Sequence, residues 1–100
     1  MKNLWTWGGE FFGYREADDL WTHNGKHVGK FHADEIYDPN GYYIGELKSD
    51  NRLISHVGKK NWRKAGFIPY GNRGGIVPYV GYVGYVLYVG YEDFPLPESF

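Results

Sequence analysis

LWTWGGEFFGYREADD (4–19) is followed by two stretches of the same length and pattern, LWTHNGKHVGKFHADE (20–35) and IYDPNGYYIGELKSDN (36–51). When the three stretches are aligned with a shift of sixteen residues, most columns keep their chemical type. A fourth unit, LISHVGKK (53–60), is shorter, and its His-Val-Gly-Lys repeats residues 27–30 letter for letter. A repeat of this kind predicts copies of one structural unit that pack against each other.

Each complete unit contains a dipeptide that favours a tight turn. Gly8-Gly9, Asn24-Gly25 and Asn40-Gly41 suit two-residue type I′ turns, in which both central residues need a positive φ. The residues on both sides are aromatic or β-branched, which is typical of strands. We therefore expect each unit to be a β-hairpin, and we expect Gly25 and Gly41 to have positive φ angles.

A second glycine follows four residues later in each unit, inside the returning strand. Glycine weakens a strand unless a bulge bends it or another group approaches the backbone closely. If the hairpins pack around a common axis, one glycine in each unit can relieve crowding at the centre. We therefore expect a bulge or a close approach at Gly13, Gly29 and Gly45.

The tandem pattern resembles a known family. An apolar-aromatic pair, a Gly turn and a Val/Ile-Gly step, followed by a Gly/Tyr-rich tail ending in Tyr91-Glu92-Asp93-Phe94, resemble the four-fold β-flower domain, a bacterial repeat domain. The resemblance covers roughly Leu4 to Phe94, although the fourth unit departs from the ideal pattern. It implies an all-β fold with four short hairpin units around a pseudo-four-fold axis, and it carries no established activity.

The rest of the chain divides into two parts, within a single expected domain over residues 1–100. Residues 61–76 are predicted to be a basic, Gly-containing linker. Residues 77–94 form a Gly/Tyr/Val-rich strand segment that begins with the triplets VPY VGY VGY VLY VGY. Because strand side chains alternate with period 2, a period of 3 places Tyr on both faces in turn. The segment is either a core strand threaded through or beside the hairpins, or a strand for self-association.

Charge is unevenly placed, although the net charge is only −1. Residues 48–73 hold seven basic side chains and one acidic side chain, whereas residues 2–46 hold four basic and eight acidic ones. Basic and aromatic side chains together suit phosphate contacts and base stacking. A solvated linker that pairs with the acidic first half explains the same pattern. We therefore expect nucleic-acid binding to be absent, with one candidate set of residues: Lys59, Lys60, Trp62, Arg63 and Lys64.

The sequence offers little for catalysis or metal binding. There is no cysteine, and neither Ser49 nor Ser55 lies in a nucleophile motif. Asp18, Asp34 and Asp50 share one column of the repeat, where Asp serves connecting turns. The remaining candidates for an acid-base or metal site are spread over the repeats: His23, His27, His32, His56 and the pairs Asp18-Asp19 and Asp34-Glu35. We predict no catalytic residue, no metal site and no cofactor.

Aromatic side chains at equivalent places in the repeat offer a different kind of site. Trp5, Trp21 and Tyr37 share one column, and Trp7 lies on the same strand face as Trp5. Such rings fill a core, or they form a rim for a sugar or another flat apolar ligand. We expect a non-enzymatic binding or protein-interaction module that forms a homo-oligomer through its C-terminal segment. The sequence MKNLWTWGGE lacks the apolar stretch of a secretory signal, so we expect a cytoplasmic protein with no membrane association.

Overall fold

The structure, a computed structural model, describes residues 1–100 and consists of one eight-stranded sheet with two short 3₁₀ helices. Neighbouring strands follow the order of the chain, and β1 also pairs with β7 in parallel, which closes seven strands into a barrel. The all-β prediction is confirmed. The elements are β1 (Lys2–Thr6), β2 (Phe11–Glu16), β3 (Asp19–Thr22), β4 (His27–His32), β5 (Glu35–Tyr37), β6 (Tyr43–Lys48), β7 (Arg52–His56), η1 (Val57–Lys59), β8 (Tyr91–Asp93) and η2 (Pro97–Ser99).

Each complete repeat unit is a hairpin whose turn contains one left-handed glycine. The φ angles of Gly9, Gly25 and Gly41 are 97°, 89° and 88°, so the predicted positive φ is confirmed. The predicted type I′ geometry is wrong, because the asparagines before Gly25 and Gly41 do not have positive φ. Instead, the Gly25 N–H donates to Thr22 O across 2.9 Å, which gives a turn followed by a left-handed glycine.

A side-chain oxygen fixes each of these turns. Thr22 Oγ1 accepts the N–H of Lys26 at 3.2 Å, and Asp38 Oδ1 accepts the N–H of Tyr42 at 2.9 Å. Thr6 does the same for the first hairpin. A polar residue at the first position of the turn satisfies a backbone donor that the hairpin ladder leaves unpaired.

The second glycine of each unit follows a β-bulge. The register shifts by one residue within each hairpin, so that Phe12, Val28 and Ile44 are the extra residues of their strands. Close approach adds to this effect. A Cβ atom on Gly29 would lie 2.7 Å from Ile36 Cγ2, and one on Gly45 would lie 2.5 Å from Phe94 Cε1. Both reasons expected from the sequence for a glycine in a strand therefore apply.

The fourth hairpin is split by a long insertion. Its outgoing strand is β7 and its returning strand is β8, while residues 57–90 take the place of the turn. The Val57 N–H donates to Gly90 O at 2.9 Å, and Gly90 has a φ of 84°, like the glycines of the other turns. The identical letters of 27–30 and 56–59 do not mark equivalent positions, because His27 begins β4 and His56 ends β7.

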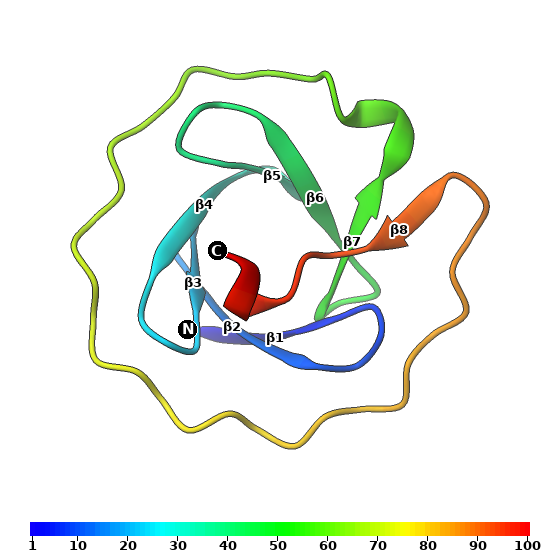
Figure 1. Cartoon of the computed structure of the whole chain (residues 1–100), viewed down its shortest axis with the longest axis horizontal. Coiled ribbons are helices and arrows are strands. Elements are labelled where there is room, and N and C mark those ends of the chain that lie inside the picture. Colours follow the sequence, from blue (N-terminus) through cyan, green and yellow to red (C-terminus); the bar gives the residue numbers. More distant parts are fainter.

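The core lies inside the barrel and is completed by the C-terminus. Phe94 is 2% exposed, and its ring centroid lies 5.2 Å from that of Phe12. Figure 1 shows the C-terminal segment turning into the middle of the ring of strands. Burial of a Phe side chain contributes about 2–3 kcal/mol to folding. The buried apolar cluster consists of Leu4, Phe12, Leu20, Val28, Phe31, Ile36, Leu53 and Phe94.

Residues 61–90, called the belt from here on, run around the outside of the barrel (Figure 1). The belt contains no strand and includes both the predicted linker and most of the predicted strand segment. Val80 and Val83 are 88% and 86% exposed, so the prediction of a core strand is wrong. The chain contains no helix of the length and apolarity needed to cross a bilayer.

Candidate functional site

The belt is attached to the three complete hairpins in a regular register. Each hairpin turn accepts two backbone hydrogen bonds from the belt, at N···O distances of 2.7–3.0 Å. The donors are nine residues apart along the belt, whereas the acceptors are sixteen residues apart along the barrel. The donor–acceptor pairs are Lys64–Gly41, Arg73–Gly25, Tyr82–Gly9, Phe67–Pro39, Ile76–His23 and Tyr85–Trp7.

A nine-residue repeat in the belt sequence matches this register. KAGFIPYGN (64–72), RGGIVPYVG (73–81) and YVGYVLYVG (82–90) align without gaps, and the predicted Val-x-Tyr triplets are part of this longer repeat. Glycine is needed at its third position, because a Cβ atom there would lie 2.7–3.1 Å from a carbonyl oxygen of a hairpin turn. The nine-residue spacing was the available sequence signal for the belt.

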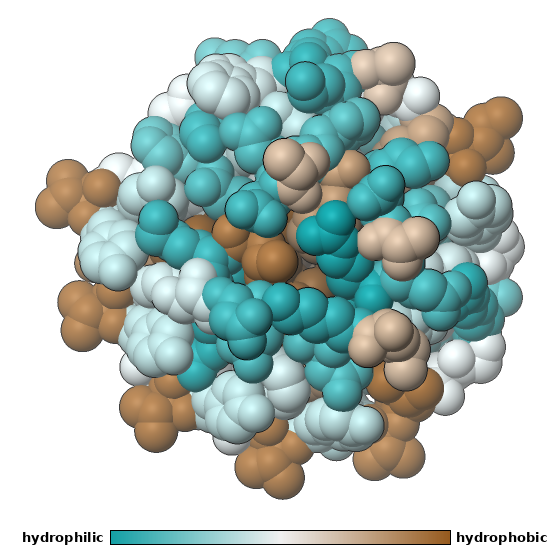
Figure 2. All heavy atoms as spheres, turned by 180° about the vertical axis from the view of Figure 1, so that it is seen from behind, coloured by the Kyte–Doolittle hydropathy of each residue, from teal (hydrophilic) through white to brown (hydrophobic).

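Side chains of the belt's second half alternate with a period of three. Tyrosines face the barrel, and valines face outward. Three residues per turn is the period of the extended polyproline II conformation, so one residue type can stay on one side. Figure 2 shows separate hydrophobic side chains along the edge of the molecule. The valine ridge is defined by five side chains that are 84–102% exposed: Val77, Val80, Val83, Val86 and Val89.

The predicted aromatic rim lies underneath the belt. Trp5, Trp7, Trp21 and Tyr37 are each 6% exposed or less. The Nε1–H of Trp5 donates to Val80 O, and that of Trp7 donates to Val86 O, both at 3.0 Å. Four rings that were considered as a ligand surface therefore hold the chain's own belt. Only Trp7 among them borders a cavity.

Arg52 is a further buried link between barrel and belt. Its guanidinium donates to Trp7 O at 3.1 Å and to Val83 O at 2.9 Å. It also lies 4.0 Å from the centroid of the Tyr85 ring. The repeat did not identify this residue, because it lies between the third unit, which ends at residue 51, and the shortened fourth unit, which begins at residue 53.

The predicted basic segment contacts the chain's own acidic and aromatic side chains. Lys59 Nζ lies 3.0 Å from carboxylate oxygens of both Glu35 and Glu46, and Lys60 pairs with Glu92 at 2.6 Å. Arg63 lies over the ring of Tyr42, Lys64 lies near Tyr37, and Trp62 is half-exposed beside Lys59. The five residues lie along one stretch of the surface, and two of their four cations, those of Lys59 and Lys60, are paired with carboxylates.

Burial and hydrogen bonds shift the pKa values of the side chains around Lys59. Burial raises the pKa of Tyr37 to about 12, and the hydrogen bond from its hydroxyl to Glu35 adds to this effect. Burial alone would raise the pKa of Glu35, but hydrogen bonds from Lys59 and Tyr37 bring it below its usual value. Burial and a hydrogen bond to Glu46 also raise the pKa of Tyr43. The cluster therefore favours ionised carboxylates and neutral phenols.

Among the histidines and paired acidic residues, His27 and Asp19 hold a buried position between barrel and belt. His27 Nδ1 accepts the N–H of Tyr70 at 3.0 Å, while its Nε2 lies 3.0 Å from Asp19 Oδ1. Its ring packs against those of both Trp21 and Tyr70, with centroid distances of 5.0 and 5.1 Å. No three His, Asp or Glu side chains of the chain are grouped to hold a metal ion. The geometry makes His27 an anchor for the belt.

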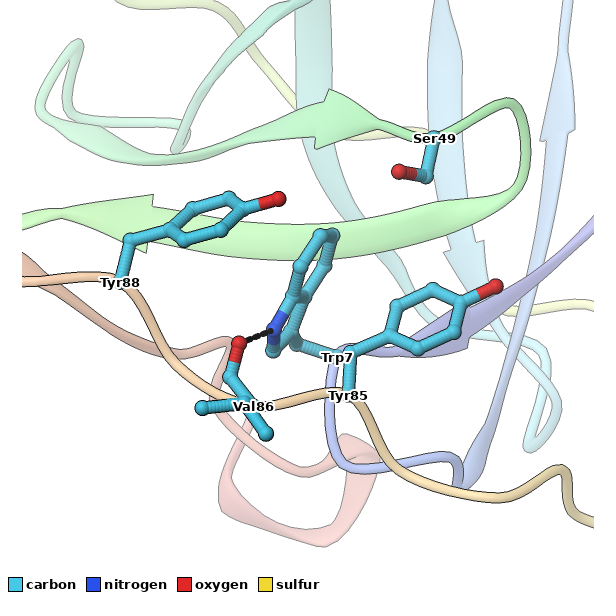
Figure 3. Close-up of a pocket in the computed structure, with 5 residues that line it drawn as sticks. All are labelled: Trp7, Ser49, Tyr85, Val86 and Tyr88. Atoms are coloured by element: carbon cyan, nitrogen blue, oxygen red, sulfur yellow. Dashed lines mark hydrogen bonds between the residues drawn. The ribbon is translucent and has the colours of Figure 1, made fainter.

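Three cavities lie where hairpin turns meet the belt or the C-terminus. Their volumes are about 300, 350 and 240 Å³, and they are lined in turn by Trp7, His23 and Pro39, which occupy one column of the repeat. The first is bordered by three aromatic rings and the hydroxyl side chain of Ser49 (Figure 3). The residues of this first cavity are Trp7, Ser49, Tyr85, Val86 and Tyr88.

Comparison with known proteins finds a family match for the barrel. Neither a curated protein nor a solved structure matches the chain. The family model of the 4-fold beta flower protein matches residues 1–70, which include the three complete hairpins, the outgoing strand of the fourth and the start of the belt. The chain belongs to the 4-fold beta flower protein family.

Proposed function

We propose that the protein is a non-enzymatic interaction module that binds a protein partner through the valine ridge. The carrying observation is the nearly complete exposure of five valines on a belt segment, residues 74–91, that has no charged residue. Exposed apolar surface without interspersed charge is typical of interaction sites. Complete burial of a valine side chain contributes roughly 1.5 kcal/mol, so a few buried valines suffice for weak binding.

A second copy of the chain is the partner that this surface favours. The valines of both copies would have the same spacing, about 9 Å for three residues of extended chain, so those of one ridge fit between those of the other. A two-fold arrangement would use the same patch on both copies. Because the ridge curves around a molecule of 36 × 33 × 22 Å, only part of it can touch a partner. We therefore expect a weak dimer that depends on concentration.

Light scattering across a concentration series tests this proposal. We expect the mass of the wild type to rise with concentration, and we expect the triple variant Val80→Lys, Val83→Lys, Val86→Lys to remain monomeric. Ile68→Lys is the matched control, because Ile68 is 93% exposed and occupies the same column of the nine-residue repeat as Val86 but lies outside the uncharged segment. A wild type that is monomeric at every concentration would contradict the proposed partner.

Nucleic-acid binding through residues 59–64 has less support. The cations of Lys59 and Lys60 already lie against Glu35, Glu46 and Glu92. We expect no gel shift with a single-stranded oligonucleotide at low salt. A shift that weakens steeply as salt rises would overturn this expectation. A bacterial, cytoplasmic setting also belongs to the proposal, and cell fractionation tests the compartment.

A further inference from the structure

Two departures from the sixteen-residue repeat meet at the first cavity. Trp7 stands where the next two units have His23 and Pro39, and Ser49 stands where the earlier units have Ala17 and Ala33. The two residues are far apart in the sequence, yet both line the cavity of about 300 Å³ between the first hairpin and the belt. Two positions at which the units differ therefore meet at one cavity.

The repeat shows that the backbone conformation of the turn requires neither side chain at its position. All three residues of the first column use their backbone carbonyl to accept a hydrogen bond from the belt, whatever their side chain. Ser49 has a φ of 53°, and the two alanines at the equivalent turns have φ angles of 52° and 56°. Alanine therefore meets the backbone requirement of the turn, and the hydroxyl of Ser49 is additional.

The cavity has aromatic walls and a hydroxyl at its edge. The rings of Tyr85 and Tyr88 lie on either side of the Trp7 indole, and Ser49 lies across the space from them (Figure 3). The Tyr85 and Tyr88 centroids are 4.9 and 5.6 Å from that of Trp7, with interplanar angles of 69° and 55°. Both tyrosines are about half-exposed, so their rings are accessible from the solvent. Such an open arrangement can hold one small ring against its aromatic side chains.

The polar groups at this cavity restrict the chemistry of a ligand. No ionisable carboxylate, lysine or arginine lines it, and its side-chain polar groups are the hydroxyls of Ser49, Tyr85 and Tyr88 together with the indole N–H of Trp7, which already donates to Val86 O. Lys48 Nζ lies 5.7 Å from the Tyr88 centroid, and the Arg52 guanidinium lies 4.0 Å from the Tyr85 centroid. These cations oppose a cationic ligand, although aromatic boxes often bind one.

We propose that this cavity binds a single neutral saccharide ring. The C–H face of a sugar would lie on the aromatic side chains, and its hydroxyls would exchange hydrogen bonds with hydroxyls that both donate and accept. A volume of about 300 Å³ is at the small end for ligand sites, which suits one ring. This site adjoins the proposed protein interaction, because Val86 belongs both to the cavity lining and to the valine ridge. Ser49, Tyr85 and Tyr88 lie outside the ridge.

Titration of the protein with sugars, followed by the NMR signal of the Trp7 indole N–H, tests the site. The probes are glucose, galactose and N-acetylglucosamine, with choline as the cationic comparison, each at up to about 50 mM. That range covers the millimolar dissociation constants expected for a ligand with few contacts. We expect at least one sugar to shift the Trp7 signal in a saturable way, and we expect no shift with choline.

Two variants and one control locate the binding. Ser49→Ala keeps a residue that the other turns already use, and we expect it to weaken sugar binding several-fold. Tyr88→Leu removes one wall, and we expect binding to weaken more than tenfold. Tyr79→Leu is the control, because Tyr79 occupies the equivalent position at the second cavity. The proposal is overturned if no sugar shifts the signal, if only choline does, or if Ser49→Ala and Tyr88→Leu bind like the wild type.

Discussion

The barrel and the belt reach their positions through different interactions. Barrel strands pair along their length, and their inward side chains form one buried cluster. The belt forms no ladder and pairs with the barrel only at an isolated antiparallel bridge between Arg63 and Tyr42. It contacts the hairpin turns through paired hydrogen bonds, tyrosine rings and Trp5, Trp7 and Arg52. An extended segment of about thirty residues can therefore be positioned without a ladder when its repeat matches the spacing of the turns that it passes.

The same difference explains where each region exposes apolar side chains. Successive side chains of a barrel strand point alternately into and out of the barrel, so every second residue can be apolar and buried. The belt turns once in about three residues, so one face packs on the barrel while the valine ridge stays in the solvent. The barrel thus provides stability, and the belt provides the surface for the proposed interaction.

Truncation of Phe94, which lies in the barrel core, is expected to lower the stability of the protein most. Phe94→Ala should lower the free energy of unfolding by about 3–5 kcal/mol, because it leaves a cavity between Phe12 and the backbone of Gly45. Denaturant unfolding measures the change. Leu96→Ala is the control, since Leu96 is 44% exposed, and an equal loss in both variants would place Phe94 outside the core.

Three glycines separate backbone strain from contact between barrel and belt. Gly25→Ala combines a positive φ with a clash against Arg73 O of the belt, and we expect a loss of about 2–3 kcal/mol. Gly90→Ala has the positive φ without any close neighbour, so about 1 kcal/mol is expected. Gly74→Ala has neither and should be nearly neutral. Equal melting temperatures for Gly25→Ala and Gly90→Ala would show that the belt does not press on the hairpin turn.

The hairpins could be predicted from the sequence because their signals are local. Asn-Gly pairs, the Thr or Asp that fixes each turn and the bulge before the second glycine all act within one unit. The geometry of the turn was missed, because Asn-Gly is compatible with both a type I′ turn and a turn that ends in a left-handed glycine. A fourth unit was expected at residues 53–60, but its returning strand was missed, because β7 and β8 are separated by the belt.

The belt and the first cavity depend on contacts that the sequence order hides. The triplets were interpreted with the period of a strand, and the nine-residue spacing becomes meaningful only beside the sixteen-residue spacing of the turns. Trp7 and Ser49 meet because β1 pairs with β7, which closes the barrel. No pattern in the sequence specifies that pairing. Repeat columns were nevertheless informative, since both residues stand out as departures from them.

Trp5 and Trp21, which share one column of the sixteen-residue repeat, differ in their hydrogen bonds to the belt. The Trp5 Nε1–H donates to Val80 O of the belt, whereas the Trp21 Nε1 is buried without a partner. Trp5→Phe should cost about 1 kcal/mol for the lost hydrogen bond. Trp21→Phe should cost less, because the same loss of volume is offset by removal of an unpaired donor. Thermal unfolding of the two variants checks the order, and the reverse order would mean that the Trp5 bond contributes nothing to belt attachment.

The smallest effect on stability is expected from the ionisation of Tyr37 at high pH. Tyr37 lies where the start of the belt meets the barrel. Burial of Tyr37 raises the pKa of its hydroxyl to about 12, above the value of about 10 for an unfolded chain. The folded state therefore favours the protonated phenol, so the contribution of Tyr37 is complete below pH 10 and is lost as the pH rises toward 12. At pH 10.5 the loss should be about 1 kcal/mol or less.

Tyr37→Phe cannot ionise there, so the difference in unfolding free energy between wild type and variant should shift in favour of the variant between pH 8 and 10.5. A difference that stays constant over this range would show that Tyr37 titrates alike in the folded and unfolded chains, and that burial and the hydrogen bond to Glu35 do not hold its proton.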